Sequence, residues 1–313
     1  MTLFKHYLKR LIDQFKRIDY KYYFDSSNNQ SPYYIDFRGK IDKRITLDSN
    51  GIPLTDCPFH KNQFDKKTLY NPTKIALYTL TQIDEYMSRK DQNILNHIDI
   101  LIQWFLDNYL ERNGSIFWGT FCDYDRYNVL KPYPSSMVQG LVLSILARYN
   151  KFCKVLKNVE EIVDKILNSF VIESKNGGIK TMLDNEIFFE ETPSSPPSYI
   201  LNGFIFSLFG LFDAVIYFKK DIANSLFRSG IKSLEKNILK FDLGYWSSYD
   251  FLYKEPATFD YHKLHISQLH VLAKMTNNEV FHAYAIKWKI YSDRLSYKYK
   301  ALIKKVYCRI IIK

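Results

Sequence analysis

Residues 241–268 carry more groups able to move protons than an ordinary core segment does. Their sequence, FDLGYWSSYDFLYKEPATFDYHKLHISQ, places tyrosines and histidines beside acids and lysines. Phenols, imidazoles and carboxyl groups are the side chains that act as general acids and bases. We therefore take this stretch as a candidate proton-transfer site.

Tyr261 opens a predicted helix in this stretch, and His262 and His265 follow on one side of it, one turn apart. The free N–H groups and the positive dipole of a helix start favour an anion, so they favour the phenolate form of Tyr261. A tyrosine that only packs its ring is the alternative. The two histidines lack a third ligand at a recognisable spacing, so we expect no metal site.

Residues 244–250 predict a turn and a short strand whose alternate side chains, Tyr245, Ser247 and Tyr249, face one way. The neighbouring Trp246 suits two roles equally well. It can stack on a sugar ring, or it can fill the mouth of a helical barrel.

A second candidate region begins at Glu190 and Glu191, just before the proline-rich loop SSPPS. A carboxyl group on such a loop can act as a general acid or base, worth about 10²- to 10⁴-fold in rate; a solvated acidic pair is the alternative. Asn202 and Gly203 then interrupt a nearly all-apolar helix, where glycine costs about 1 kcal/mol relative to alanine and a buried amide needs a partner. Close helix packing or a ligand would account for them.

The elements that must position these residues are mostly helices, about eight of them after residue 67, joined by loops of alternating length. This pattern predicts a mainly α fold, an α/α toroid over residues 67–313, whose long loops (113–136, 173–198 and 241–262) gather at one end. Residues 1–66 are predicted to hold an amphipathic helix and a β-rich lead-in.

Several local signals place the elements along the chain. Asn50-Gly51 predicts a hairpin between short strands. Asn71 and Pro72 predict the N-cap and first position of a helix. The next helix is predicted over residues 94–112 and closed by Asn113-Gly114, and the last over residues 279–295.

Composition limits the partners. The chain carries 44 Lys and Arg against 33 Asp and Glu, a formal charge of +11, which predicts attraction to polyanions. Without a nucleic-acid-binding signature, an anionic polysaccharide or membrane surface is favoured over nucleic acid. The basic amphipathic stretch 3–23 either docks on its own domain or lies on an anionic membrane. Four scattered cysteines and no apolar run of about 18 residues favour a cytoplasmic protein.

Four stretches in this order resemble the C-terminal domain of the D-glucuronyl C5-epimerases, which convert glucuronate to iduronate in heparosan-type chains. They are YNPTKIALYTL (70–80), SSMVQGLVLSILARY (135–149), EETPSSPPSYILNGFIFSLFGLFD (190–213), and FDLGYWSSYD with FDYHKLHISQL (241–250 and 259–269). YYIDFRGK with NGIPL is similar to the β lead-in of prokaryotic members. Together these cover about three quarters of the chain.

The resemblance implies catalysis by tyrosines and a glutamate, and the matching residues are Tyr249, Tyr261 and Glu191. A proton-transfer route requires no redox cofactor, so none is expected. The resemblance also implies an anionic uronate polysaccharide as substrate, and a homodimer is expected. The substrate-binding residues expected are His262, His265, Lys263, Lys254, Trp246, Asn202, Gln139 and Trp118.

This sequence departs from the family pattern at two places. Thr192 stands where the family commonly has tyrosine after the glutamate pair, and the arginine that vertebrate members carry after the YD pair is absent from YDFLYK. Lys254 or Lys263 is then expected to recognise the substrate carboxylate, as a point charge and not a bidentate fork.

Epimerisation at C5 removes a proton next to a carboxylate and returns one to the opposite face, so it needs two acid/base groups and nearby cations. Tyr261 and Glu191 are the expected pair, and Tyr249 assists. A polysaccharide lyase would use the same proton abstraction, and a hydrolase would need two carboxyl groups, for which Glu191 and Asp250 are the only candidates. A non-catalytic glycan-binding protein is the third alternative.

Overall fold

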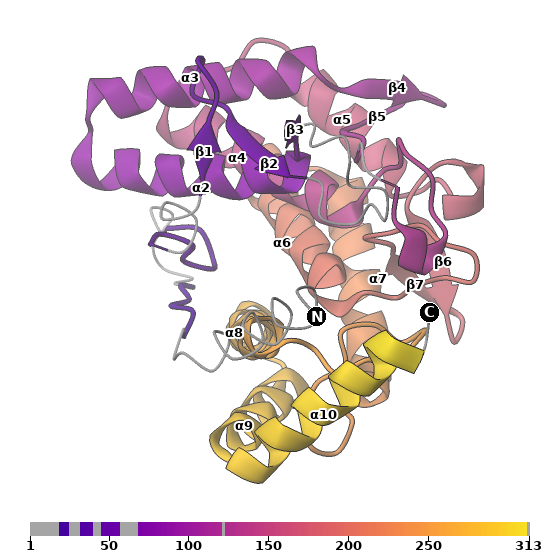
Figure 1. The fold of residues 1–313 in the computed structure, drawn as a ribbon. Helices are drawn as coiled ribbons and strands as arrows, with labels where there is room; N and C mark the ends of the chain where they lie inside the picture. The colour runs from indigo at the N-terminus through magenta and orange to yellow at the C-terminus, as the bar shows by residue number, and fades with distance from the viewer. Residues whose placement is uncertain (1–18, 25–31, 40–44, 57–67, 121–122, 312–313) are drawn as a thin grey trace. The chain divides into compact units, whose positions relative to one another are not determined.

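The computed structural model describes residues 19–24, 32–39, 45–56, 68–120 and 123–311, and these are mainly helical, as predicted (Figure 1). The chain forms two compact units. Unit 1 combines Met1–Asp36 with Glu235–Lys313, and unit 2 is the continuous segment Phe37–Leu234. The predicted toroid stays a prediction, because it concerns the arrangement of all the helices about one axis.

Unit 2 holds the first helices and the described strands. Its helices are α2 (Pro72–Arg89), α3 (Gln92–Asp107), α4 (Ser136–Phe152), α5 (Val159–Ser169), α6 (Leu201–Phe218) and α7 (Asp221–Asn237), the last residues of α7 belonging to unit 1. As predicted, Asn71 caps α2, its side chain accepting the N–H groups of Thr73 and Lys74.

Short antiparallel strands decorate the helices of unit 2. β1 (Thr46–Leu47), β2 (Pro53–Asp56) and β3 (Thr68–Tyr70) form one sheet in that order, which confirms the hairpin predicted at Asn50-Gly51. β6 (Lys180–Leu183) and β7 (Glu186–Phe189) form another hairpin. The sheet of β1–β3 contacts α2 and belongs to unit 2. The domain boundary predicted at residue 66 stays a prediction.

One predicted helix end is wrong. The helix expected to reach residue 112 ends at Asp107, and the following residues form the hairpin of β4 (Leu110–Arg112) and β5 (Ser115–Phe117). Asn113 and Gly114 both have positive φ, 53° and 70°, which is the backbone of a two-residue hairpin turn. The Asn-Gly pair is therefore the turn of a β-hairpin and not the predicted helix end.

The centre of unit 2 is the contact of α4 with α6. A Cβ on Gly140 would lie 2.5 Å from the carbonyl oxygen of Phe206, and one on Gly210 would lie 2.1 Å from that of Gly140. The two glycines thus let the helix backbones touch. α6 is long and apolar enough to cross a membrane. However, 78% of the segment Leu201–Phe218 is buried inside the protein, as in the core helix of a folded domain.

Unit 1 is built on α8 (Phe259–Thr276), α9 (Glu279–Asp293) and α10 (Leu295–Ile311), where α9 contacts both of the others. A segment from the other end of the chain docks on α8: the Tyr22 ring stacks on His270 at 5.1 Å, and Ser267 donates a hydrogen bond to the carbonyl of Tyr20. The predicted helix over residues 3–23 lies mostly outside the described residues. α10 was not predicted at all.

Candidate functional site

The loop after β7 fixes Glu191 against the start of α6, within unit 2. Asn202 donates a hydrogen bond from Nδ2 to Glu191 Oε2 at 3.0 Å. At Gly203, an added Cβ would lie 2.2 Å from the same oxygen and 2.5 Å from the Glu191 Cβ. Asn202 and Gly203, which are unusual in an apolar helix, are therefore the residues against which the Glu191 side chain packs.

The surroundings of Glu191 favour a protonated carboxyl near neutral pH. Burial raises the pKa of the Glu191 carboxyl to about 8, and the negative charge of Glu190 acts in the same direction. Hydrogen bonds from Asn202 and the Gly203 backbone lower the pKa, but desolvation outweighs them. A carboxyl with such a pKa can both release and accept a proton near pH 8.

Glu190 has a different task from its neighbour. It is fully buried, and its carboxylate accepts hydrogen bonds from the Ser198 hydroxyl at 2.6 Å and from the backbone N–H of Tyr199 at 3.1 Å. Thr192 is also buried, and its carbonyl accepts a second bond with the Ser198 hydroxyl at 2.9 Å. These contacts close the proline-rich loop on itself and hold Glu191 in place.

Tyr133 is a phenol of the same region that the sequence analysis did not single out. The Ser136 N–H donates to the Glu190 carbonyl at 2.9 Å, which joins the start of α4 to the glutamate loop. Burial raises the pKa of Tyr133 to about 12, a Thr120 hydrogen bond opposes this, and the charge of Glu191 adds to it. The only sequence signal was its place in the aromatic loop 113–136.

Two predicted substrate-binding residues of unit 2 make the contacts of core side chains. Gln139 is fully buried and donates to the carbonyl of Ile116 and to the hydroxyl of Ser169. Trp118 is 1% exposed and donates to the carbonyl of Phe105. Both side chains are enclosed by the protein, and the substrate contacts predicted for them stay predictions.

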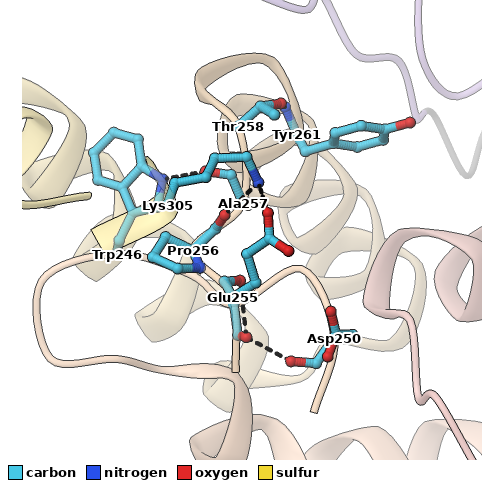
Figure 2. Close-up of polar contacts among 9 residues, drawn as sticks. Trp246, Asp250, Glu255, Pro256, Ala257, Thr258, Tyr261 and Lys305 are labelled. Atoms are coloured by element: carbon cyan, nitrogen blue, oxygen red, sulfur yellow. Dashed lines mark hydrogen bonds and ion pairs between the residues drawn. The ribbon is translucent and has the colours of Figure 1, made fainter. Parts of the chain in front are cut away.

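In unit 1 the structure brings Tyr249 and Tyr261 together. Their rings meet edge to face, with centroids 5.1 Å apart and an interplanar angle of 62°. Tyr261 lies in the first turn of α8, where its N–H donates to the side chain of the N-cap Thr258, and 37% of the residue is exposed. Its ring points away from Glu255 and Lys305 (Figure 2).

The loop that carries Tyr249 is fastened by a buried ion pair. Lys305, from α10, lies 2.6 Å from Glu255 Oε1 and also donates to the Pro256 carbonyl at 2.9 Å (Figure 2). The Glu255 carbonyl in turn accepts the N–H of Tyr249 at 2.8 Å. Asp250, the hydrolase candidate, is fully buried and accepts the N–H of Tyr253.

His262 and His265 converge on one hydroxyl. Ser247 Oγ lies 2.7 Å from His262 Nδ1 and 2.9 Å from His265 Nδ1, and His262 Nε2 lies 3.0 Å from the Trp288 carbonyl. Since a carbonyl only accepts, His262 carries its proton on Nε2. The same-side placement is confirmed, and the shared partner Ser247 was not foreseen.

This histidine cluster is neutral. Both rings are fully buried, and desolvation lowers the pKa of His265 to about 3 and that of His262 well below its ordinary value. Trp246 stacks on His262 at 3.7 Å and donates to the Ala257 carbonyl. Trp246 lies in the interior of unit 1 with 1% exposure, and the substrate contacts predicted for Trp246 and the two histidines stay predictions.

The two lysines of this region differ. Lys263 forms an ion pair with Asp19 at 3.0 Å, whereas Lys254 is exposed and places its ammonium 5.0 Å from the centre of the Phe251 ring. Among the described residues, no group of three or more His, Cys, Asp or Glu side chains is arranged to hold a metal ion.

The sequence is similar to those of known proteins. The family model for the C-terminus of D-glucuronyl C5-epimerase matches residues 112–290. A D-glucuronyl C5-epimerase from Caenorhabditis elegans is 30% identical over 207 residues, which is 59% of this chain and 33% of that protein. An uncharacterized protein from Methanocaldococcus jannaschii is 25% identical over 179 residues, 56% of this chain and 57% of that protein.

The match has two features of note. It includes Glu191, Tyr249 and Tyr261, and it begins at the β4–β5 hairpin. The aligned part spans about a third of the nematode protein and a little over half of the archaeal one.

Proposed function

Because this chain belongs to the D-glucuronyl C5-epimerase family, we propose that it inverts C5 of D-glucuronate residues to L-iduronate in an anionic polysaccharide such as heparosan. The observation within the chain that carries the proposal is the environment of Glu191. There Asn202 and Gly203 fix a carboxyl whose pKa is raised to about 8. A proton-transfer group works best when its pKa lies near the working pH.

The reaction breaks the C5–H bond and remakes it on the opposite face of the ring. One group takes the proton, which leaves an enediolate-like dianion on C5 and its carboxylate, and a second group donates a proton from the other side. No atom is gained or lost, and the two groups end with exchanged protonation states. We assign these two roles to Glu191 and Tyr261.

The remaining assignments follow the contacts. Tyr249, against the Tyr261 ring, is assigned a hydrogen bond to the reacting region. Lys254, exposed near the same loop, is assigned the substrate carboxylate, because its charge offsets the developing dianion. The formal charge of +11 suits a polyanionic chain. The homodimer, the N-terminal membrane contact and the cytoplasmic location stay predictions.

The test is proton exchange at C5. Purified protein is incubated with heparosan and with other uronate polymers in D₂O, and deuterium at C5 is followed by NMR. Incorporation into uncut chains supports the proposal. Chain cleavage with ultraviolet-absorbing unsaturated ends would identify a lyase, and no exchange on any polymer would contradict the proposal.

Two variants connect the activity to the assigned groups. Glu191→Gln and Tyr261→Phe each remove one proton-transfer group, and we expect exchange to fall about 10²- to 10⁴-fold in each. Glu161→Gln and Tyr109→Phe are matched controls, since Glu161 is a surface residue of α5 and Tyr109 is 38% exposed. Loss of exchange in the controls, or retention in the two variants, would contradict the assignment.

A further inference from the structure

α10 has a second apolar face, opposite the one that it buries in unit 1. Its inner face holds Ala301, Lys305 and Cys308, which are 3%, 5% and 1% exposed. Its outer face carries a stripe of large apolar residues at four-residue spacing, namely Leu295 (64% exposed), Tyr299 (56%), Ile303 (69%) and Tyr307 (50%). Residues four apart lie on one side of a helix, so the stripe is continuous.

Lysines border this stripe. At about 100° per residue, Lys298 falls on one side of it, and Lys300 and Lys304 fall on the other. From Arg294 to the end of the sequence no aspartate or glutamate occurs. The outer face of α10 therefore combines exposed aliphatic and tyrosine side chains with cationic borders.

Charge decides among the possible occupants of this face. Residues 1–18 contain five Lys or Arg and a single acid, Asp13, and a second copy would bring the same lysines, so both would be repelled. A sugar polyanion matches the lysines but not the aliphatic stripe. An anionic bilayer matches both, because lysines reach its headgroups while apolar and tyrosine side chains enter the acyl boundary.

We propose that the outer face of α10 docks the protein on an anionic lipid bilayer, with the helix axis parallel to the membrane plane. The proposal concerns a surface distinct from the proton-transfer residues, and it holds whether or not the chain is an epimerase. This surface on α10 is separate from the basic stretch 3–23, for which the sequence left membrane contact open.

The experiment is co-sedimentation of the full chain with vesicles. We expect binding to vesicles of equal parts phosphatidylcholine and phosphatidylglycerol, little binding to phosphatidylcholine alone, and weakening of the former by salt. The double variant Leu295→Gln/Ile303→Gln should bind about tenfold more weakly, since both side chains lose their apolar burial. Ile222→Gln, at a 44% exposed isoleucine of α7, is the matched control.

A fluorescent probe at α10 keeps the test decisive even if the double variant folds poorly. In Tyr299→Trp, anionic vesicles should shift the added tryptophan emission to shorter wavelength and protect it from an aqueous quencher. Binding with no change at this probe would place the contact elsewhere and overturn the proposal. Equal binding to both vesicle types would also overturn it, as would dimers in solution that the double variant dissociates.

Discussion

The two regions that carry the candidate acid/base groups are built in opposite ways. In unit 2 the candidate carboxyl of Glu191 is partly buried against the start of α6, and desolvation raises its pKa to about 8. In unit 1 Tyr261 keeps 37% of its surface exposed, while the groups behind it are buried: the Ser247–histidine cluster and the Lys305–Glu255 pair.

In one region the surroundings change the pKa of the acid/base group, and in the other they hold the group in position. A buried carboxyl acquires a new proton affinity from its surroundings, so its pocket is part of its chemistry. An exposed tyrosine needs only to be held at the right place, so the buried groups behind it act by fixing the backbone. Changes in the two regions should therefore have different signatures.

The largest effect is expected where a buried charge in unit 1 loses its partner. Lys305→Met removes the ammonium that lies 2.6 Å from the buried Glu255 carboxylate, and we expect a loss of about 3–5 kcal/mol in the free energy of unfolding, measured by chemical denaturation. Lys289→Met, at a 53% exposed lysine, should change little. Adding Glu255→Leu to Lys305→Met should recover most of the loss, and a failure to recover would show that the pair is not its cause.

A methyl group against Glu191 should give the next largest effect. In Gly203→Ala the new Cβ meets Glu191 Oε2 and Cβ, and such overpacking costs about 1–3 kcal/mol. The displaced carboxyl is more hydrated, so we expect its pKa to fall and exchange at C5 to be lost. In a Glu191→Gly background the same substitution should cost much less stability, and an unchanged cost would assign the strain to the helix itself.

Ser247→Ala tests whether the histidine cluster only positions. It removes the hydroxyl shared by two buried rings, which should cost about 1–2 kcal/mol of stability. We expect a lower rate of exchange at C5 with the same pH profile, measured across the range near pH 8. A shifted profile would show that the cluster tunes a proton-transfer group as well.

The most gradual effect is the titration of Glu191 itself, because it is spread over several pH units. The carboxyl has a pKa of about 8 in the folded chain and an ordinary value of 4.5, so between these pH values unfolding releases a proton. The free energy of unfolding should fall as the pH rises through this window, by at most about 1.4 kcal/mol per pH unit. Below pH 4.5 the contribution is fully present.

Denaturation at several pH values checks this slope. Glu191→Gln has no carboxyl to titrate, so it should lose that part of the pH dependence and become more stable than the parent as the pH approaches 8. Glu161→Gln should keep the slope of the parent. Parallel curves for the parent and Glu191→Gln would contradict the raised pKa.

Local sequence rules predicted several parts of this fold because the cause lay within a few residues. Asn71 with Pro72 gave the start of α2, and Asn50-Gly51 gave a hairpin. The same reasoning flagged Asn202 and Gly203 as out of place. It could not say that Glu191 was their reason, because that contact spans the whole proline-rich loop.

The features that the sequence did not predict share a physical cause, which is their dependence on contacts between distant residues. Asn113-Gly114 suits both a helix end and a hairpin, and only the pairing of β4 with β5 decides. The burial of His262 and His265 depends on Ser247 and Trp288, which come from other elements. The outer stripe of α10 hid the helical pattern of its inner face, so the last helix was overlooked.

The docking of Tyr20 and Tyr22 on α8 has a consequence for how the protein is made. The two parts of unit 1 lie at opposite ends of the chain, whereas unit 2 is one continuous segment. On the ribosome, unit 2 can fold as soon as it emerges. The segment around Tyr22 can dock only after α8 has been synthesised. The region of Tyr249 and Tyr261 is therefore expected to fold last.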